Sequence, residues 1–279
     1  MLNASRRMWR ASPLTYIGLL IAVLISIFPF YYMFVIGTRT NDQIHDTPPP
    51  FTPSGNFGDN FGRVVDIQEV HFWEGLLNSL IVCVAITVSV LITSTLAGFA
   101  FAKLKFRGRN FLLLAVLATM MVPTQLGIIP LYGMFQDLGL FDNLLAVIIP
   151  FLTSAFGVFM MRQYASSAVS DELIEAARVD GCSTLRIYWS VVLPALRPAA
   201  GVLGLLIFME NWNSFLWPYA ILQEHPTIQV SLFHITRQFY TDYSMVFAAT
   251  SVATIPLVLV FIVFGRQIIG GLMEGAVKA

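Results

Sequence analysis

Long apolar runs separated by short polar segments dominate this chain. A helix needs roughly 17 to 25 mainly apolar residues to cross a bilayer, and six stretches meet that length. They lie at about 13–36, 76–102, 111–136, 144–163, 197–222 and 246–268. Runs such as Leu112 to Leu117 do not alternate, which argues against a transmembrane barrel. The pattern predicts an all-α polytopic membrane protein with six transmembrane helices in a single domain, residues 1–279.

Composition supports a membrane location. Hydrophobic residues make up 57% of the chain and charged residues only 11%, whereas about a quarter of the residues in a soluble domain are charged. The formal net charge is zero, so the composition implies no nucleic acid or acidic macromolecule as partner. Membrane lipid is the expected surrounding.

The distribution of Lys and Arg predicts the orientation. Alternating sides of the six spans receive unequal numbers of these residues. One side collects Arg6, Arg7, Arg10, Lys103, Lys105, Arg107, Arg109, Arg162, Arg178, Arg186, Arg197, Arg266 and Lys278, and the other keeps Arg39, Arg63 and Arg237. Because short loops rich in Lys and Arg stay inside, both termini and the 164–196 loop are expected in the cytoplasm. The first run is longer than the apolar core of a signal peptide and lacks a cleavage site, so we interpret it as a retained span.

A polar island interrupts the apolar sequence from Ser170 to Gly181. Ser170 can cap a helix, acidic residues follow in the first turn, and Gly181 permits a turn at the end. We therefore expect a short cytoplasmic helix. Small side chains and acidic acceptors on it suit docking of another protein, through Glu175, Ala176, Ala177, Asp180 and Gly181. A solvated helix with small residues is the alternative.

Several motifs together resemble one family. They are Glu175-Ala-Ala-x-x-Asp180-Gly181 with Leu193-Pro194 and Pro198, Asn60-Phe61, Asn78-Ser79, Pro123 with Ile129-Pro130-Leu131, Trp212-Asn213-x-Phe215-Leu216, and the ending Gly271 to Lys278. The first is similar to the EAA loop of binding-protein-dependent ABC importer permeases. The Trp-Asn pair and the ending are similar to the carbohydrate branch, in particular to the second permease of maltose-type systems. Cys182, where the family usually has Ala, and Glu210 depart from the pattern.

This resemblance implies the fold of a type I ABC importer transmembrane domain in the cytoplasmic (inner) membrane of a bacterium or archaeon. It also implies three partners: a homologous permease forming a heterodimer, a homodimeric ATPase, and an extracytoplasmic sugar-binding protein. The EAA helix would sit in a groove of the ATPase, and the tail Gly275 to Ala279 would reach between the ATPase subunits. The chain has no G-x-x-x-x-G-K-[ST] phosphate loop, so ATP and Mg belong to the partner and no cofactor is expected here.

Polar residues near the fifth span form a second candidate site. By register Glu210 lies near mid-membrane, beside Asn211, Trp212 and Asn213. An ionisable group at that depth is expected to face a partner or water, so these residues either line a translocation path or make contacts between helices, with Thr93 or Ser94 as candidate partners of Glu210. Trp212 and Trp217 could stack on a sugar ring or serve in packing.

The outer loop 223–245 contains the polar turn Glu224, His225, Pro226 and Thr227. The resemblance implies that this loop probes the sugar cleft of the binding protein. A plain turn is the alternative. Neither Cys nor a second His lies near His225 in sequence, so no metal site is predicted, and Cys83 and Cys182 are not expected to pair.

We find no sequence pattern of a catalytic site, since H-E-x-x-H and G-x-S-x-G are absent. The chain is therefore expected to be a transporter subunit and not an enzyme. A different class remains open: an ion-coupled secondary carrier acting alone, with Glu210 as the coupling carboxylate. An amino-acid or phosphate permease that shares the EAA loop is a further alternative, against which the Trp212-Asn213 pair and the tail argue.

Overall fold

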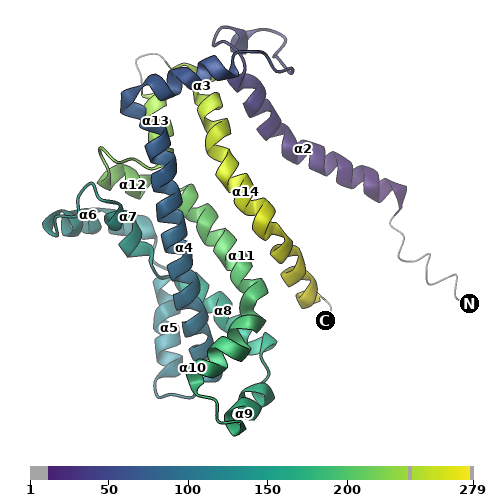
Figure 1. Cartoon of the computed structure of the whole chain (residues 1–279), viewed down its shortest axis with the longest axis vertical. Helices are drawn as coiled ribbons and strands as arrows, with labels where there is room; N and C mark the ends of the chain where they lie inside the picture. Colours follow the sequence, from purple (N-terminus) through teal and green to yellow (C-terminus); the bar gives the residue numbers. More distant parts are fainter. Residues whose placement is uncertain (1–11, 238–240, 277–279) are drawn as a thin grey trace, which may run out of the picture. The chain divides into compact units, whose positions relative to one another are not determined.

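The structure is a computed structural model that describes residues 12–237 and 241–276, and the regular elements in these ranges are all helical. This confirms the predicted fold class (Figure 1). The α-helices are α2 (Pro13–Gly37), α3 (Phe57–Asp66), α4 (Phe72–Lys103), α5 (Arg109–Thr119), α6 (Ile128–Asp137), α7 (Leu144–Ile148), α8 (Ala155–Ala168), α9 (Asp171–Val179), α10 (Thr184–Ile187), α11 (Leu193–Trp212), α12 (Leu216–Ile221), α13 (Ile228–Thr236) and α14 (Tyr243–Ala276). Short turns η1 (Gln43–His45), η2 (Gln68–Val70), η3 (Thr124–Gly127), η4 (Ile149–Phe151) and the π-helical η5 (Tyr188–Val192) lie between them.

Four of the described helices are long and apolar enough to cross a membrane, and two bent helix pairs raise the number of candidate spans to six. Arg6, Arg7 and Arg10 lie outside the described residues, as do positions 277–279 of the tail from Gly275 to Ala279. The chain divides into two compact units, residues 1–70 with 234–253, and residues 71–233 with 254–279. We call them unit 1 and unit 2.

Unit 1 joins the end of α2, α3 and the first turns of α14. The buried Asn60 amide on α3 donates to the carbonyls of Gly37 at 2.9 Å and Arg39 at 2.7 Å. Arg63, one turn later, donates to Asp242 at 2.8 Å. Gly37 needs to be glycine, because a Cβ there would lie 2.9 Å from the Ala248 backbone nitrogen. Polar groups on α3 thus satisfy the open carbonyls at the end of α2.

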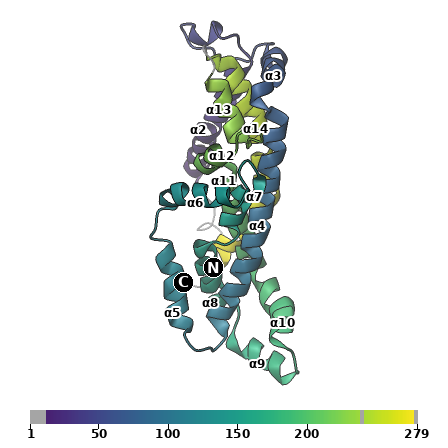
Figure 2. The same cartoon turned by 90° about the vertical axis from the view of Figure 1, so that its left-hand side faces the viewer.

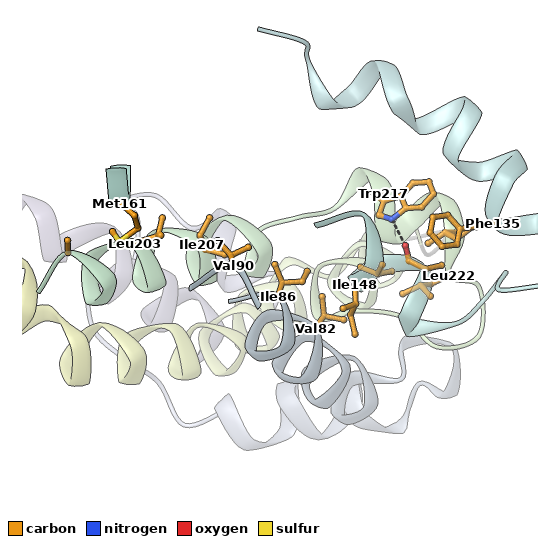
Figure 3. Packing of buried hydrophobic residues seen from close by; sticks show 14 residues of the cluster. Val82, Ile86, Val90, Phe135, Ile148, Met161, Leu203, Ile207, Trp217 and Leu222 are labelled. Atoms are coloured by element: carbon orange, nitrogen blue, oxygen red, sulfur yellow. Dashed lines mark hydrogen bonds between the residues drawn. The ribbon is translucent and has the colours of Figure 1, made fainter. Parts of the chain in front are cut away.

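Unit 2 is built around α4, which packs against α8 and α11. Small residues allow the helices to approach closely: a Cβ at Gly98 of α4 would lie 2.6 Å from the Met161 Cβ of α8. One apolar cluster combines residues of α4, α8 and α11 with Phe135, Ile148 and Trp217 (Figure 3). The Trp217 indole N–H donates to the Ala146 carbonyl at 3.1 Å. Figures 1 and 2 both place α9 and α10 where α4 ends.

Prolines break the third and fourth predicted spans. Helices 109–119 and 124–137 meet at a bend of 85°, and 144–151 and 155–168 meet at 40°. Pro123 lies at the first bend, where it has no N–H to donate and disfavours helical geometry in the residue before it. At the second bend Pro150 lies in η4, and Ser154 starts a new helix by accepting the Gly157 N–H at 3.1 Å. The sequence pattern therefore gives continuous spans where the structure has broken ones.

The fifth span differs most from its expected position. The structure has a continuous helical segment at Thr184–Trp212 and a separate α12 at 216–221, where the pattern predicts one span at about 197–222. Pro194 is near the start of α11 and follows the π-helical turn η5, so the prolines lie inside the helical segment without ending it. As a consequence Glu210 lies two residues before the end of the segment, whereas the predicted span of about 197–222 put it near mid-membrane.

Candidate functional site

Helix α9 contains the expected docking residues, and both of its ends are capped. The Ser170 hydroxyl accepts the Leu173 N–H at 3.4 Å, and Asp171 and Glu172 occupy the first turn. At the other end Gly181 has φ 78°. The Gly181 N–H donates to the Arg178 carbonyl at 3.0 Å and the Cys182 N–H to the Ala177 carbonyl at 2.9 Å. This pair of bonds is a Schellman motif, whose left-handed residue favours glycine.

The inner face of α9 is anchored to unit 2 by apolar contacts. Ile174 is 5% exposed and packs in a cluster with Phe99 of α4, Ala165 of α8, and Ile187 and Leu196 of the fifth-span segment. Ala177 and Cys182 pack against the same cluster. Ala177 therefore faces the bundle, whereas the sequence alone places it with Ala176 on the docking face. Burial of these side chains should make α9 move together with the helices beneath it.

The outer face of α9 is more apolar than the sequence interpretation anticipated. Leu173 is 55% exposed and Val179 is 88% exposed, with the exposed Ala176 between them. Leu185 of α10 and Trp189 of η5 are also exposed, at 67% and 62%. The sequence does contain a signal for this exposed apolar face, in the adjacent pairs Leu173-Ile174 and Ala176-Ala177. Such pairs place apolar residues on two neighbouring stripes of the helix, and when the bundle buries one stripe the other stays exposed.

Charged groups surround this face. The Lys103 ammonium lies 2.8 Å from the Asp171 carboxylate, and this hydrogen bond is the main reason that the pKa of Asp171 is lowered. The pKa of Glu172 is lowered chiefly by a backbone N–H at the helix N-terminus. Glu175, Arg178 and Asp180 are exposed. An apolar centre with a charged rim has the anatomy of a protein interface.

The predicted outer-loop site, the turn 224–227, is only half exposed. Glu224 and His225 are exposed, whereas Pro226 and Thr227 are buried and so are not available to a partner in this conformation. The Asp142 carboxylate accepts the N–H groups of Gln223 at 2.7 Å, Glu224 at 3.1 Å and His225 at 3.4 Å. The position of the turn is thus fixed by a residue 81 positions away from Gln223, which no local pattern indicates.

Helix α4 holds the same turn from the other side. His225 Nδ1 lies 2.6 Å from one Glu74 oxygen, and His71 Nδ1 lies 3.3 Å from the other. The hydrogen bond to Glu74 is the main cause of the raised pKa of His225. The Asn78 amide donates to the Pro226 carbonyl at 3.0 Å, and the Ser79 hydroxyl accepts the Ile228 N–H at 2.8 Å. Among the described residues, no group of three or more His, Cys, Asp or Glu could hold a metal ion.

The predicted site residues at the end of α11 fall into two groups, buried tryptophans and exposed polar residues. Trp212 is 2% exposed and stacks on Phe208 at 5.6 Å, and Trp217 is 4% exposed. Both indoles therefore serve in packing and neither can stack on a sugar here. Glu210 and Asn213 are exposed, and the Asn211 and Asn213 amides donate to the carbonyls four residues earlier at 2.8 Å. Thr93, one expected partner of Glu210, instead donates to the Ser89 carbonyl.

The described residues form a helical bundle with candidate membrane spans, and an anchored helix on an interspan loop exposes an apolar face that is suited to contact with another protein. The family model "Binding-protein-dependent transport system inner membrane component" matches residues 89–269, and the chain belongs to this family. It is therefore a multi-pass permease subunit of the bacterial inner membrane, part of an ABC importer with an ATPase and a binding protein. ATP hydrolysis belongs to the partner subunits, and a carrier acting alone through Glu210 does not fit this family.

Characterised relatives cover nearly the whole chain. An arabinooligosaccharides transport system permease protein, AraQ of Halalkalibacterium halodurans, is 31% identical over 94% of this chain and 95% of its own. The lactose transport system permease protein LacG of Rhizobium radiobacter is 33% identical with the same coverage. The crystal structure of a bacterial ABC transporter that imports the acidic polysaccharide alginate contains a chain with TM-score 0.77 and 26% identity, covering 91% of this chain and 95% of that one.

Proposed function

We propose that this permease imports a carbohydrate and pairs with a homologous second permease as a heterodimer. The similar permeases of arabinooligosaccharide and lactose systems support a sugar, and a glycerol-3-phosphate permease of Yersinia pestis, 29% identical, broadens the candidates to a phosphorylated polyol. Pairing is supported by α2, whose described side chains are mostly exposed and apolar until Val35. Such a helix can be covered by lipid, by the second permease or by both.

We further propose that the chain is one permease domain with six spans, in which α5 with α6 and α7 with α8 each form one bent span. Sorting of Lys and Arg puts the 164–196 loop in the cytoplasm, so α9 meets the ATPase there. Its anchored inner face and exposed apolar outer face carry this assignment. Glu175, Ala176, Asp180 and Gly181 contribute to the docking site together with Leu173 and Val179.

On the outer side, the exposed Glu224 and His225 are the part of the turn that can meet the binding protein, with Pro226 and Thr227 holding it from beneath. Glu210 and Asn213 are proposed to face the translocation path or the second permease, which is supported by their exposure at the end of α11. Asn211 and Trp212 support them through a helix-end hydrogen bond and through packing. The tail from Gly275 is proposed to reach the ATPase subunits.

The docking assignment is tested by Gly181→Pro. Proline fixes φ near −65° and has no N–H, so it can neither adopt the φ of 78° at this position nor donate to Arg178. We expect the ATPase to be lost from affinity-purified permease. Gly181→Asn is the matched control, because asparagine tolerates the left-handed region. Normal assembly and transport in the proline variant would contradict the assignment.

The substrate class is tested on the assembled complex in lipid vesicles with its binding protein. Arabinooligosaccharides, lactose, alginate oligosaccharides and sn-glycerol 3-phosphate form the panel, chosen from the systems of the relatives. Stimulation of ATP hydrolysis by one of the glycans supports the sugar assignment. Stimulation by the phosphorylated polyol alone would overturn the sugar assignment. Stimulation by an amino acid, with no response to any member of the panel, would overturn it as well.

A further inference from the structure

Helix α4 differs from the other described spans in having no proline. It runs unbroken through 32 residues, roughly 48 Å at 1.5 Å per residue. Prolines occur at positions 13, 29, 123, 130, 150, 194, 198 and 256 in the other described spans. Since proline removes a helical hydrogen bond and permits bending, α4 is the span best suited to transmit a displacement along its full length.

One end of α4 is tied to α9 by charge. Lys103 is the last residue of α4, and its side chain is only 7% exposed. Its ammonium lies 2.8 Å from the carboxylate of Asp171, the first residue of α9. The Asp171 side chain is 78% exposed, so the pair links a shielded lysine at the end of α4 to the solvent side of α9. A second contact lies one layer deeper, where the buried Thr95 and Tyr188 hydroxyls are 2.8 Å apart.

The opposite end of α4 is tied to the turn at 223–228. Glu74 contacts His225, Asn78 donates to the Pro226 carbonyl, and Ser79 accepts the Ile228 N–H. Two of these contacts are buried. From Glu74 to Lys103 is 29 helical steps, or roughly 43 Å. The same helix therefore holds the proposed ATPase-docking helix at one end and the proposed binding-protein turn at the other.

Between its ends α4 is enclosed along one side by α8 and α11. Gly98 leaves no space against Met161, and a Cβ at Gly157 of α8 would collide with the Ser94 hydroxyl. Close packing of this kind resists sliding or bending of one helix against the next. A push on Lys103 should consequently displace the whole of α4 and not only its last turn.

We propose that α4 is the mechanical link between the docking helix and the outer turn, with Lys103 and Asp171 as its positioning residues. This inference rests on the proposed function, because it assigns the two ends to the ATPase and the binding protein. When ATP closes the ATPase, α9 moves, Asp171 displaces Lys103, and α4 transfers that movement to the turn at His225. Binding of the binding protein acts in the reverse direction, since coupling between two sites is reciprocal.

The test uses the whole complex in vesicles with its binding protein. Lys103→Met removes the charge and keeps an apolar stem, and Asp171→Asn removes the partner charge while Ser170 still caps α9. We expect the ATPase to remain bound and its maximal stimulation by the binding protein to fall about fivefold or more, the range of a typical coupling energy. The affinity of the binding protein for the nucleotide-free complex should stay unchanged, because the outer surface is intact.

Two controls separate coupling from general damage. Lys105→Met removes an exposed lysine two residues further on, and it should keep full stimulation. Lys103→Arg keeps the positive charge and should retain most of the stimulation. An equal loss in Lys105→Met, or full stimulation in both Lys103→Met and Asp171→Asn, would overturn the link and leave the importer assignment intact. Failure of the unmodified chain to bind any ATPase would instead overturn the proposed function.

A fluorescence experiment can follow the movement of the outer turn directly. A fluorophore on Glu224→Cys, an exposed position of the turn, is placed in a Cys182→Ala background so that the half-buried native thiol is absent. Nucleotide should change its emission in the otherwise unmodified complex, and that change should be lost with Asp171→Asn. Persistence of the full change in Asp171→Asn would contradict transmission through Lys103.

Discussion

The two ends of unit 2 are held by different forces. The α9 end is fixed by buried apolar side chains around Ile174 and by the ion pair between Lys103 and Asp171. The turn at His225 is fixed by polar contacts to Asp142, Glu74, Asn78 and Ser79. One end is therefore attached by contacts that respond little to pH or salt, and the other by contacts of which several are charged and exposed.

This difference suits two kinds of partner. A helix that receives mechanical work must not shift against its own bundle, and dense apolar packing provides that resistance. A turn that meets a binding protein only during part of a cycle can be held by exposed polar bonds, each of which contributes modestly to stability.

The largest effects are expected at the α9 end, from one substitution on each face of the helix. Val179→Asp places a charge on the exposed apolar face and should weaken ATPase binding by about 2 kcal/mol or more, roughly 30-fold, as for an interface hot spot. Because Val179 is 88% exposed, the permease itself should keep its thermal stability. ATPase affinity and permease unfolding temperature are measured on the same preparations.

Ile174→Ala is the counterpart on the inner face. Removing a buried isoleucine should destabilise unit 2 by about 2 to 5 kcal/mol, seen as a lower unfolding temperature. The comparison between the ends fails if Val179→Asp unfolds the permease, or if Ile174→Ala leaves its stability unchanged.

A medium effect is expected from Asp142 at the other end. Asp142→Ala removes the acceptor for three N–H groups of the turn and should reduce its local stability by about 1 to 3 kcal/mol. Faster amide hydrogen exchange at 223–225 would show this. Asp142→Asn is the control, since it keeps an oxygen acceptor and tolerates the positive φ of 55°. Unchanged exchange in the alanine variant would mean that other contacts suffice.

The smallest effect is a pH dependence confined to the turn. Glu74 raises the pKa of His225, and the charges of Asp142 and Glu224 raise it further. His71 contacts the other oxygen of Glu74. A raised folded pKa stabilises the turn fully below the ordinary value near 6.5 and loses this contribution as pH rises through the folded value. Amide exchange at 223–225 should accordingly quicken above neutral pH, and α9 should show no matching change.

His225→Gln should make that profile flat, whereas His45→Gln, an exposed histidine in unit 1, should leave it unaltered. Exchange that slows with rising pH, after correction for the intrinsic rate, would reverse the assigned sign.

The sequence predicted much of α9 and less of the turn. Ser170, the acidic first turn and Gly181 are local signals, because capping depends on neighbours within a few residues. Val179 was missed because a helix with two apolar stripes does not reveal which one the bundle covers. Asp142 and Glu74 were missed because their bonds to the turn span long separations in the chain.

By itself, the sequence determined that the chain is a helical membrane protein of the importer family and that a capped helix ends at Gly181. These features follow from hydrophobic length, local capping and short motifs. The tertiary structure decided where the spans bend, that Glu210 lies near a helix end, and which face of α9 is exposed. It also decided that Lys103 and Glu74, near opposite ends of α4, contact Asp171 and His225. Those outcomes depend on packing between distant segments, which neither periodicity nor a local motif encodes.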